Sequence, residues 1–161
     1  MATSSARRRK FDSLEQEVYL HLWRTFDRLK VIEEQVFDQH ELSAQQYNAL
    51  RLLKAVHPGT MPTLALGGRL VSRAPDMTRL LDRLEERKLV ARERRADNRR
   101  VVEVGITAAG LTLLDELATE VRACHRRQLG HLDDKELRQL ASLLSAARQP
   151  HEDPVNPWPF Q

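Results

Sequence analysis

Aromatic residues are scarce, at 5% of the 161 residues, and the chain has a single cysteine, Cys124. One cysteine cannot form an intrachain disulfide, which excludes a disulfide framework and a multi-cysteine zinc site. No apolar run approaches a membrane span, and the basic residues 1–10 are followed by Phe11 and Asp12 instead of the apolar stretch of a signal peptide. We therefore expect a cytoplasmic protein with no membrane contact and a core built mostly from aliphatic side chains.

The motifs of the common enzyme classes are missing as well. The sequence contains no Gly-rich phosphate loop, no nucleophile elbow and no metalloprotease motif. His125 and His131 are six residues apart, a spacing that does not put them on one helical face, as zinc ligands would require. We expect no enzymatic activity, no cofactor and no metal site. Cys124 fits the apolar stripe of a helix, with an oxidant-sensing thiol as the alternative.

Positive charge is unevenly distributed along the chain, although the net charge is only +3. Residues 58–100 contain eleven basic and six acidic side chains, whereas residues 11–57 and 101–161 are both net acidic. Such a basic block is typical of a surface that neutralises phosphates, and a solvated charged helix face is the alternative. Residues 1–11 are expected to form a flexible basic arm, which either contacts DNA or is simply solvated.

Apolar residues at spacings of three and four predict six helices. The predicted helices span residues 12–39, 43–57, 62–70, 74–88, 107–130 and 133–149. Their starts carry capping signals, namely the capping boxes Asp12/Glu15, Ser43/Gln46 and Asp133/Glu136 and the N-cap Thr107. A single helical domain over residues 12–149 follows. Four prolines in residues 150–161 predict a disordered tail, although Trp158 and Phe160 could dock elsewhere on the molecule.

Two features flank the fourth predicted helix. The short helix before it contains Gly67-Gly68, which would let another helix approach closely. After it the period changes to two, which predicts a two-stranded hairpin over residues 89–106 with a basic loop at 96–99. A short helix, a tight turn, a helix with a basic outer face and a basic hairpin form the winged helix-turn-helix arrangement, in which the second helix enters the major groove of DNA. We therefore predict a mainly α fold with a β-hairpin wing, the winged helix-turn-helix spanning residues 43–106.

Residues 70–110 resemble the core of the MarR family of transcription regulators. The likeness rests on the RLLDRLEE run of the fourth helix, on the basic first strand of the wing, and on a signature made of Asp97, Arg99, Val104, Ile106 and Thr107, with Gly110 beyond it. The chain departs from the family where Asn98 replaces a common second wing arginine and where Gly67-Gly68 interrupt the first helix of the motif.

The resemblance implies a homodimer whose interface is formed by the interlocked helices 12–39, 107–130 and 133–149. It further implies a DNA-binding regulator, by family habit a repressor, that binds a pseudo-palindromic operator with half-sites roughly 34 Å apart. Relatives are often released from DNA by a small aromatic or anionic effector. Tyr19 and Trp23 are candidates to line such an effector pocket, and packing against the partner subunit is the alternative.

Fork-shaped or short polar side chains suit the edges of bases and the phosphates. The predicted DNA-binding residues are Arg73, Thr78, Arg79, Arg83, Arg94, Arg95, Asp97, Arg99 and Arg100. Arg99 is expected at the wing tip in or near the minor groove, and its pairing with Asp97 is the alternative. For Arg79 and Arg83 the alternative is that one of them pairs with Asp82 or Glu86 on the helix surface. Asp76 fits a helix cap or a cytosine-reading acceptor. A protein-interaction module and a non-specific architectural DNA-binding protein are the alternative functions.

Overall fold

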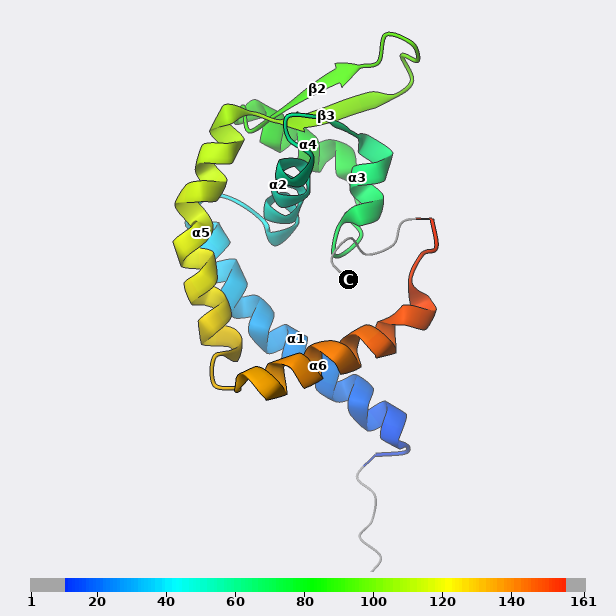
Figure 1. The fold of residues 1–161 in the computed structure, drawn as a ribbon, viewed down its shortest axis with the longest axis vertical. Helices are drawn as coiled ribbons and strands as arrows, with labels where there is room; N and C mark the ends of the chain where they lie inside the picture. Colours follow the sequence, from blue (N-terminus) through cyan, green and yellow to red (C-terminus); the bar gives the residue numbers. More distant parts are fainter. Residues whose placement is uncertain (1–10, 156–161) are drawn as a thin grey trace, which may run out of the picture.

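The computed structural model describes residues 11–155 as a mainly helical chain with a small antiparallel sheet (Figure 1). The predicted mainly α fold with a hairpin wing is confirmed. Its elements are α1 (Leu14–Asp38), α2 (Ala44–Val56), β1 (Met61–Pro62), α3 (Thr63–Arg69), α4 (Met77–Glu86), β2 (Val90–Arg94), β3 (Val102–Ile106), α5 (Ala108–Leu129), α6 (Asp134–Arg148) and the 3-10 helix η1 (Gln149–His151). The predicted basic arm, apart from Phe11, lies outside the described residues, as do Trp158 and Phe160. None of the helices within residues 11–155 has the length and apolar character to cross a membrane.

The first helix begins one residue later than its predicted cap. Ser13, not Asp12, is the N-cap, and its hydroxyl accepts a hydrogen bond from the Gln16 backbone N–H at 3.1 Å. Asp12 instead exchanges hydrogen bonds with the Gln16 side chain. The predicted Asp12/Glu15 capping box is therefore wrong, because two adjacent residues can each cap a helix and Ser13, the second of them, does so here. The capping boxes of Ser43 with Gln46 and of Asp133 with Glu136 are confirmed.

The sheet has a third strand that the sequence did not reveal. β1 pairs with β3, with Met61 opposite Val104 and Pro62 opposite Glu103, so the strand order is β1-β3-β2. Pro62 was expected inside the third helix, which instead begins at Thr63. A two-residue strand contains no alternation of apolar and polar residues, so no period-two signal precedes it.

The core lies within the winged helix-turn-helix and extends along α5 as far as Cys124. Its most deeply buried side chains are Leu50, Leu53, Leu66, Leu81, Leu84, Leu117, Val90 and Val104. Each buried leucine contributes roughly 1.5–3 kcal/mol through the hydrophobic effect. Phe37 adds a ring that stacks on Tyr47, with centroids 4.6 Å apart, and so attaches the end of α1 to this core.

The outer helices α1 and α6 are buried far less than α5 and the winged helix-turn-helix. α5 descends from the wing along one side of the molecule, α1 crosses its lower part, and α6 runs from the end of α5 across α1 (Figure 1). No residue of α6 is buried. Large apolar side chains are exposed on α1 and α6, namely Leu14, Val18, Tyr19, Leu20, Leu22, Trp23, Phe26, Val31, Leu143 and Leu144. These two helices therefore present apolar surface that the chain itself does not cover.

Beyond α6 the chain forms the single turn η1, within the segment where the sequence predicts no regular structure. Arg148 and Glu152 form an ion pair around this turn, and the Asp153 carboxylate accepts a hydrogen bond from the Val155 N–H at 2.8 Å. Cys124 is buried on α5, and burial is the main cause that raises the pKa of its thiol above the ordinary value. A raised pKa is the opposite of what a reactive thiol requires, which favours the packing interpretation of Cys124.

Candidate nucleic-acid interface

Helix α4 has one buried and one exposed face. Leu80, Leu81 and Leu84 are buried against the core, whereas Thr78, Arg79 and Arg83 are exposed. Asp76 is the N-cap, with its carboxylate accepting a hydrogen bond from the Arg79 N–H at 2.9 Å, which bears out the cap interpretation. The exposed face therefore presents two guanidinium groups and a hydroxyl on a helix whose start is fixed by its own sequence.

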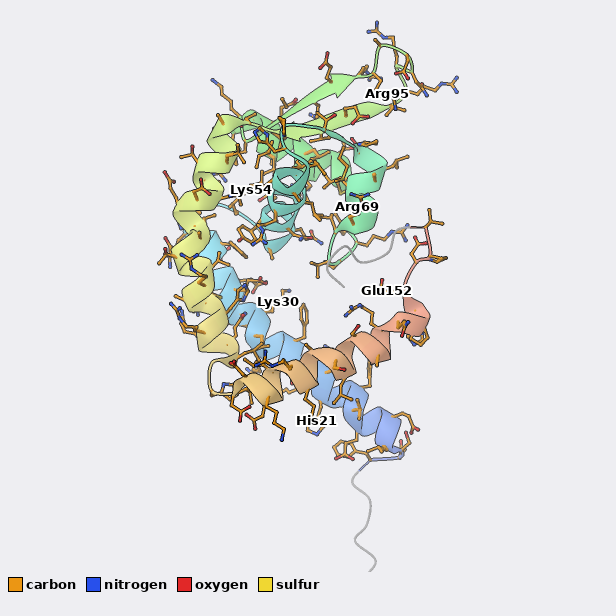
Figure 2. All side chains as sticks on the ribbon, viewed as in Figure 1. His21, Lys30, Lys54, Arg69, Arg95 and Glu152 are labelled. Carbon is orange, nitrogen blue, oxygen red and sulfur yellow. The ribbon has the colours of Figure 1, made fainter. Side chains whose placement is uncertain are left out.

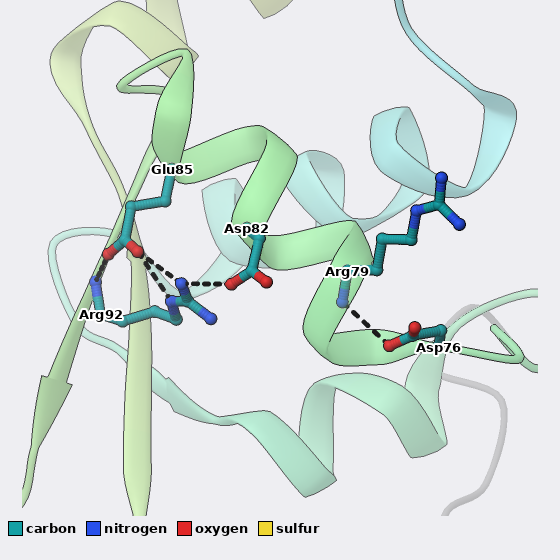
Figure 3. A network of polar contacts seen from close by, with 5 residues as sticks. All are labelled: Asp76, Arg79, Asp82, Glu85 and Arg92. Carbon is teal, nitrogen blue, oxygen red and sulfur yellow. Dashed lines mark hydrogen bonds and ion pairs between the residues drawn. The ribbon is translucent and has the colours of Figure 1, made fainter.

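The acidic side chains of α4 are paired with the wing instead of with the arginines of the helix. Arg92 on β2 donates to Asp82 Oδ1 at 2.6 Å and to Glu85 Oε2 at 3.0 and 2.5 Å, and its backbone N–H donates to Glu85 Oε1 at 3.2 Å (Figure 3). These hydrogen bonds lower the pKa of Glu85 and raise that of Arg92. The Arg92 guanidinium offsets one of the two negative charges of Asp82 and Glu85, and the network ties the wing to α4.

Arg79 and Arg83 are consequently available for another partner. In Figure 3 the Arg79 side chain extends away from Asp82 and Glu85. No ion pair of either arginine is found among residues 11–155, so the alternative in which Asp82 or Glu86 neutralises one of them is not what the fold adopts. Sequence spacing missed Arg92, because its partners lie seven and ten residues away on a different element.

The wing loop is closed by its own hydrogen bonds. The Val101 N–H donates to the Asn98 carbonyl at 2.9 Å, and the Arg100 N–H donates to the Asn98 side-chain oxygen at 3.2 Å. Asn98, which departs from the family pattern, therefore caps the turn. Arg95 donates to both oxygens of Asp97, at 2.9 and 2.6 Å, and this pair lowers the pKa of Asp97.

These contacts determine which arginines of the wing have an ion-pair partner and which do not. Asp97 pairs with Arg95, not with Arg99, which leaves the Arg99 guanidinium without an ion-pair partner within the described chain. Arg94 donates to the Arg99 carbonyl at 2.8 Å and so supports the backbone of the tip. All nine predicted DNA-binding residues are exposed, and the structure places them on α4, on the loop before it and on the wing.

The loop before α4 is held by α2. The Asn48 side-chain oxygen accepts from the Val71 N–H at 2.8 Å, and the Gln45 amide donates to the Arg73 carbonyl at 3.4 Å. Asn48 and Gln45 thereby position the backbone around Arg73. Sequence analysis did not single out either residue, because a polar residue on a helix gives no sign of which distant backbone group it will meet.

The signature residues after the wing have a structural explanation. The Thr107 hydroxyl donates to the Lys88 carbonyl at 2.6 Å and accepts from the Gly110 N–H at 3.1 Å, so this residue caps α5 and links it to the end of α4. A Cβ on Gly110 would lie 2.4 Å from the Leu89 carbonyl oxygen. Glycine is therefore required at position 110, where the start of α5 packs against the backbone just before β2. This close packing holds the wing against α5.

The fold and this arginine-rich face define a winged helix-turn-helix protein of the DNA-binding class. The model of the MarR family matches residues 42–102. The crystal structure of a MarR transcription factor from Planctomyces limnophilus matches this chain with 60% sequence identity and a TM-score of 0.68. The match covers 85% of this chain and 99% of that chain. The chain belongs to the MarR family of transcriptional regulators and is a DNA-binding protein.

Two further relatives indicate what such regulators do. The repressor MdtR of Bacillus subtilis is 24% identical over 141 residues, which cover 88% of this chain and 90% of MdtR. The structure of BpsR from Bordetella bronchiseptica, whose DNA binding is regulated by 6-hydroxynicotinic acid, is 23% identical with a TM-score of 0.71, covering 84% of this chain and 95% of that one. The relatives are transcription regulators and not enzymes, which points to the same for this chain.

Proposed function

We propose that this protein is a homodimeric repressor whose two recognition helices read a pseudo-palindromic operator. The observation that carries the proposal is the division of charge on α4 and the wing: Asp82 and Glu85 both pair with Arg92, whereas the guanidinium groups of Arg79 and Arg83 form no ion pair within residues 11–155. Guanidinium forks on an exposed helix face suit the acceptors of guanine in the major groove.

Within this proposal the nine exposed residues have different roles. Thr78, Arg79 and Arg83 read base edges, and Arg73 contacts the backbone at the start of the helix. Arg99 and Arg100 place free positive charge at the wing tip, in or beside the minor groove. Arg94, Arg95 and Asp97 contact DNA less and mainly hold the tip in shape, since each already has a partner inside the wing.

The proposed dimer is supported by the exposed apolar surface of α1 and α6. Trp23 and Phe26 are 62% and 65% exposed, and Leu143 on α6 is 61% exposed. Exposed apolar patches of this extent on two long helices are typical of a protein–protein interface. A second copy of the chain is the occupant that also supplies the second recognition helix which a pseudo-palindromic site requires.

The proposed effector site is a cavity of about 390 Å³ between α1, α2 and the loop before α4. Phe26 and Tyr47 give it aromatic walls, Arg51 supplies a cation, and Val71 and Ser72 belong to the loop that leads to the recognition helix. Glu33 also lines the cavity, and burial raises the pKa of its carboxyl group, which favours the neutral form beside an anion. An aromatic anion fits this combination of apolar walls and guanidinium. Because the cavity joins α1 to the DNA-binding unit, a ligand there would change the affinity for DNA if it favoured one spacing of the recognition helices.

The test of the DNA-binding proposal is a mobility shift with the DNA upstream of the protein's own gene, repeated over a series of salt concentrations. Saturable, sequence-selective binding is expected. Arg79→Ala should weaken it by about 1–3 kcal/mol and relax the preference at one base pair, whereas Arg99→Ala should weaken it for all sequences and lower the salt slope by about one. Arg122→Ala, an exposed arginine on α5, is the matched control and should leave binding unchanged. Weak binding without sequence preference would contradict the operator model.

The effector is tested separately by adding 6-hydroxynicotinic acid or benzoate to the protein–DNA complex. Release by either compound, abolished in Arg51→Gln with DNA affinity retained, supports the site. Release that persists in Arg51→Gln would contradict it.

A further inference from the structure

A groove on the DNA-binding unit is not explained by the functions described so far. It has a volume of about 600 Å³ and lies between α3 and α4, with Leu64, Gly67, Leu70 and Met77 among its lining residues. Leu64 is 90% exposed, the largest exposure among the large apolar side chains of the described chain. A Cβ on Gly67 would lie 3.4 Å from Met77 Cγ, so the Met77 side chain packs directly over this glycine. Gly67 and Gly68, which carry no side chains, and Arg73 also line the groove.

The far end of the chain reaches this groove. Asp153, which follows α6 and η1, lines it together with the residues of α3 and α4. Figure 1 shows this end of the chain, coloured red, rising from α6 toward α3, and Figure 2 shows Glu152 on the same ascending stretch. The ion pair of Arg148 with Glu152 and the hydrogen bond from Val155 to Asp153 fix the direction of this stretch.

We propose that the groove between α3 and α4 is the docking site for residues 156–161 of the same chain, with Trp158 and Phe160 as its apolar anchors. Trp158 follows Val155 by three residues and Phe160 by five, which gives them a reach of about 10 and 17 Å at about 3.4 Å per residue. Since Asp153 already lies at the groove, both side chains can enter it without any movement of α6.

The composition of residues 156–161 suits such a site. Their sequence is Asn-Pro-Trp-Pro-Phe-Gln, so Asn156 and Trp158 each precede a proline and are restricted to extended backbone. A restricted segment loses less conformational entropy when it binds, and an indole ring buries about 150–250 Å² of surface. An apolar groove edged by Leu64 and Met77 matches two aromatic side chains on an extended backbone.

Docking would make the end of the chain a strap between α6 and the helix-turn-helix. α6 has no buried residue, and its main contacts within residues 11–155 are with η1, the element that follows it. The strap would add a connection from the last helix to α3 and α4, and so would limit the movement of the recognition helix relative to α6.

The experiment uses the fluorescence of Trp158 in the full-length protein. The chain has two tryptophans, so Trp23→Phe leaves Trp158 as the single indole. In this background Trp158 should emit at shorter wavelength and be quenched by acrylamide several-fold less than in the free peptide NPWPFQ. Leu64→Gln should restore the accessibility of the free peptide, and it should not disturb folding because Leu64 is exposed. Arg69→Gln, on the same helix but outside the groove, is the matched control and should change nothing.

Two outcomes would overturn the proposal. Trp158 could be as accessible in the Trp23→Phe protein as it is in the peptide, or it could be protected equally in the Trp23→Phe protein and in the Trp23→Phe/Leu64→Gln double variant.

Mixed dimers with two different affinity tags, all in the Trp23→Phe background, distinguish docking within one chain from docking onto a second copy. One chain keeps Trp158 but carries Leu64→Gln, and the other has an intact groove with Trp158→Phe. Exposed Trp158 in the mixed dimer supports docking within one chain, and protected Trp158 overturns it. Neither readout depends on DNA binding.

Discussion

The winged helix-turn-helix and the outer helices α1 and α6 use their apolar residues in opposite ways. In the former, leucines such as Leu50, Leu53 and Leu84 are completely buried within the chain. In the latter, Leu22, Trp23 and Leu143 face outward although their spacing is just as regular. The difference shows that one part of the chain completes its own core, whereas the other leaves apolar surface that the described chain does not cover.

The largest effect is expected from breaking the internal core. Leu53→Ala should destabilise the protein by about 2–5 kcal/mol, because a fully buried leucine leaves a cavity that its neighbours fill only in part. Urea unfolding followed by circular dichroism measures the change. Glu116→Ala, at an exposed position of α5, is the control and should remain within about 0.5 kcal/mol of the wild type. Equal losses in both variants would contradict the distinction.

The next effect concerns the outer surface. Leu143→Glu should raise the dissociation constant of the proposed dimer at least about tenfold, since an unpaired carboxylate in an apolar interface costs more than about 1.4 kcal/mol. Sedimentation equilibrium measures the shift toward monomer. Ser145→Glu, on the opposite side of α6, is the control. A wild-type protein that sediments as a monomer at all concentrations would refute the dimer itself.

A smaller effect distinguishes positioning residues from phosphate contacts. Arg92→Gln should lower operator affinity by about tenfold, or about 1.4 kcal/mol, because it frees two carboxylates beside the reading face and releases the wing from α4. The salt slope should stay unchanged, in contrast to Arg99→Ala, since Arg92 contacts no phosphate in this arrangement. A slope that falls by about one in Arg92→Gln would show instead that Arg92 touches the DNA backbone.

The smallest effect is a pH dependence of the same network. The pKa of Glu85 is lowered by hydrogen bonds from Arg92, so the stabilisation is fully present above the ordinary value of 4.5 and is lost as the pH falls through the folded value. The difference in melting temperature between the wild type and Glu85→Gln should therefore be constant near neutral pH and shrink below pH 4.5. A difference that is the same on both sides of this pH would count against the ion pair. Thr119→Ser on α5 serves as a neutral control.

The sequence predictions are accurate where a contact joins residues that are close along the chain, and they fail where it joins residues that are far apart along the chain. Ser43 and Gln46 form their capping box within one turn of helix, and the predicted box is present. The first helix shows the limit of this reasoning, because Asp12 and Ser13 are both good caps and the choice between them depends on one residue of register. The two-residue strand β1 gave no pattern at all, since it exists only through its pairing with β3.

In the candidate site, too, the sequence predicted some features and not others. The exposed arginines of α4 follow from helical periodicity and from the family signature, and the structure places them on the surface as expected. The partners of Asp82 and Asp97 did not follow, because several arginines lie within reach along the sequence. Only the packing of β2 against α4 brings Arg92 to Asp82, and only the closed wing loop brings Arg95 to Asp97.

By itself the sequence determined the order of the six helices and the hairpin, the family and the set of charges that face outward, because periodicity, caps and signature residues act over a few neighbours along the chain. The tertiary structure alone decided which of those charges are neutralised and which apolar faces remain uncovered. The reason is physical: whether an arginine is free or an apolar stripe is buried depends on what the fold brings against it, and that neighbour comes from a distant part of the chain.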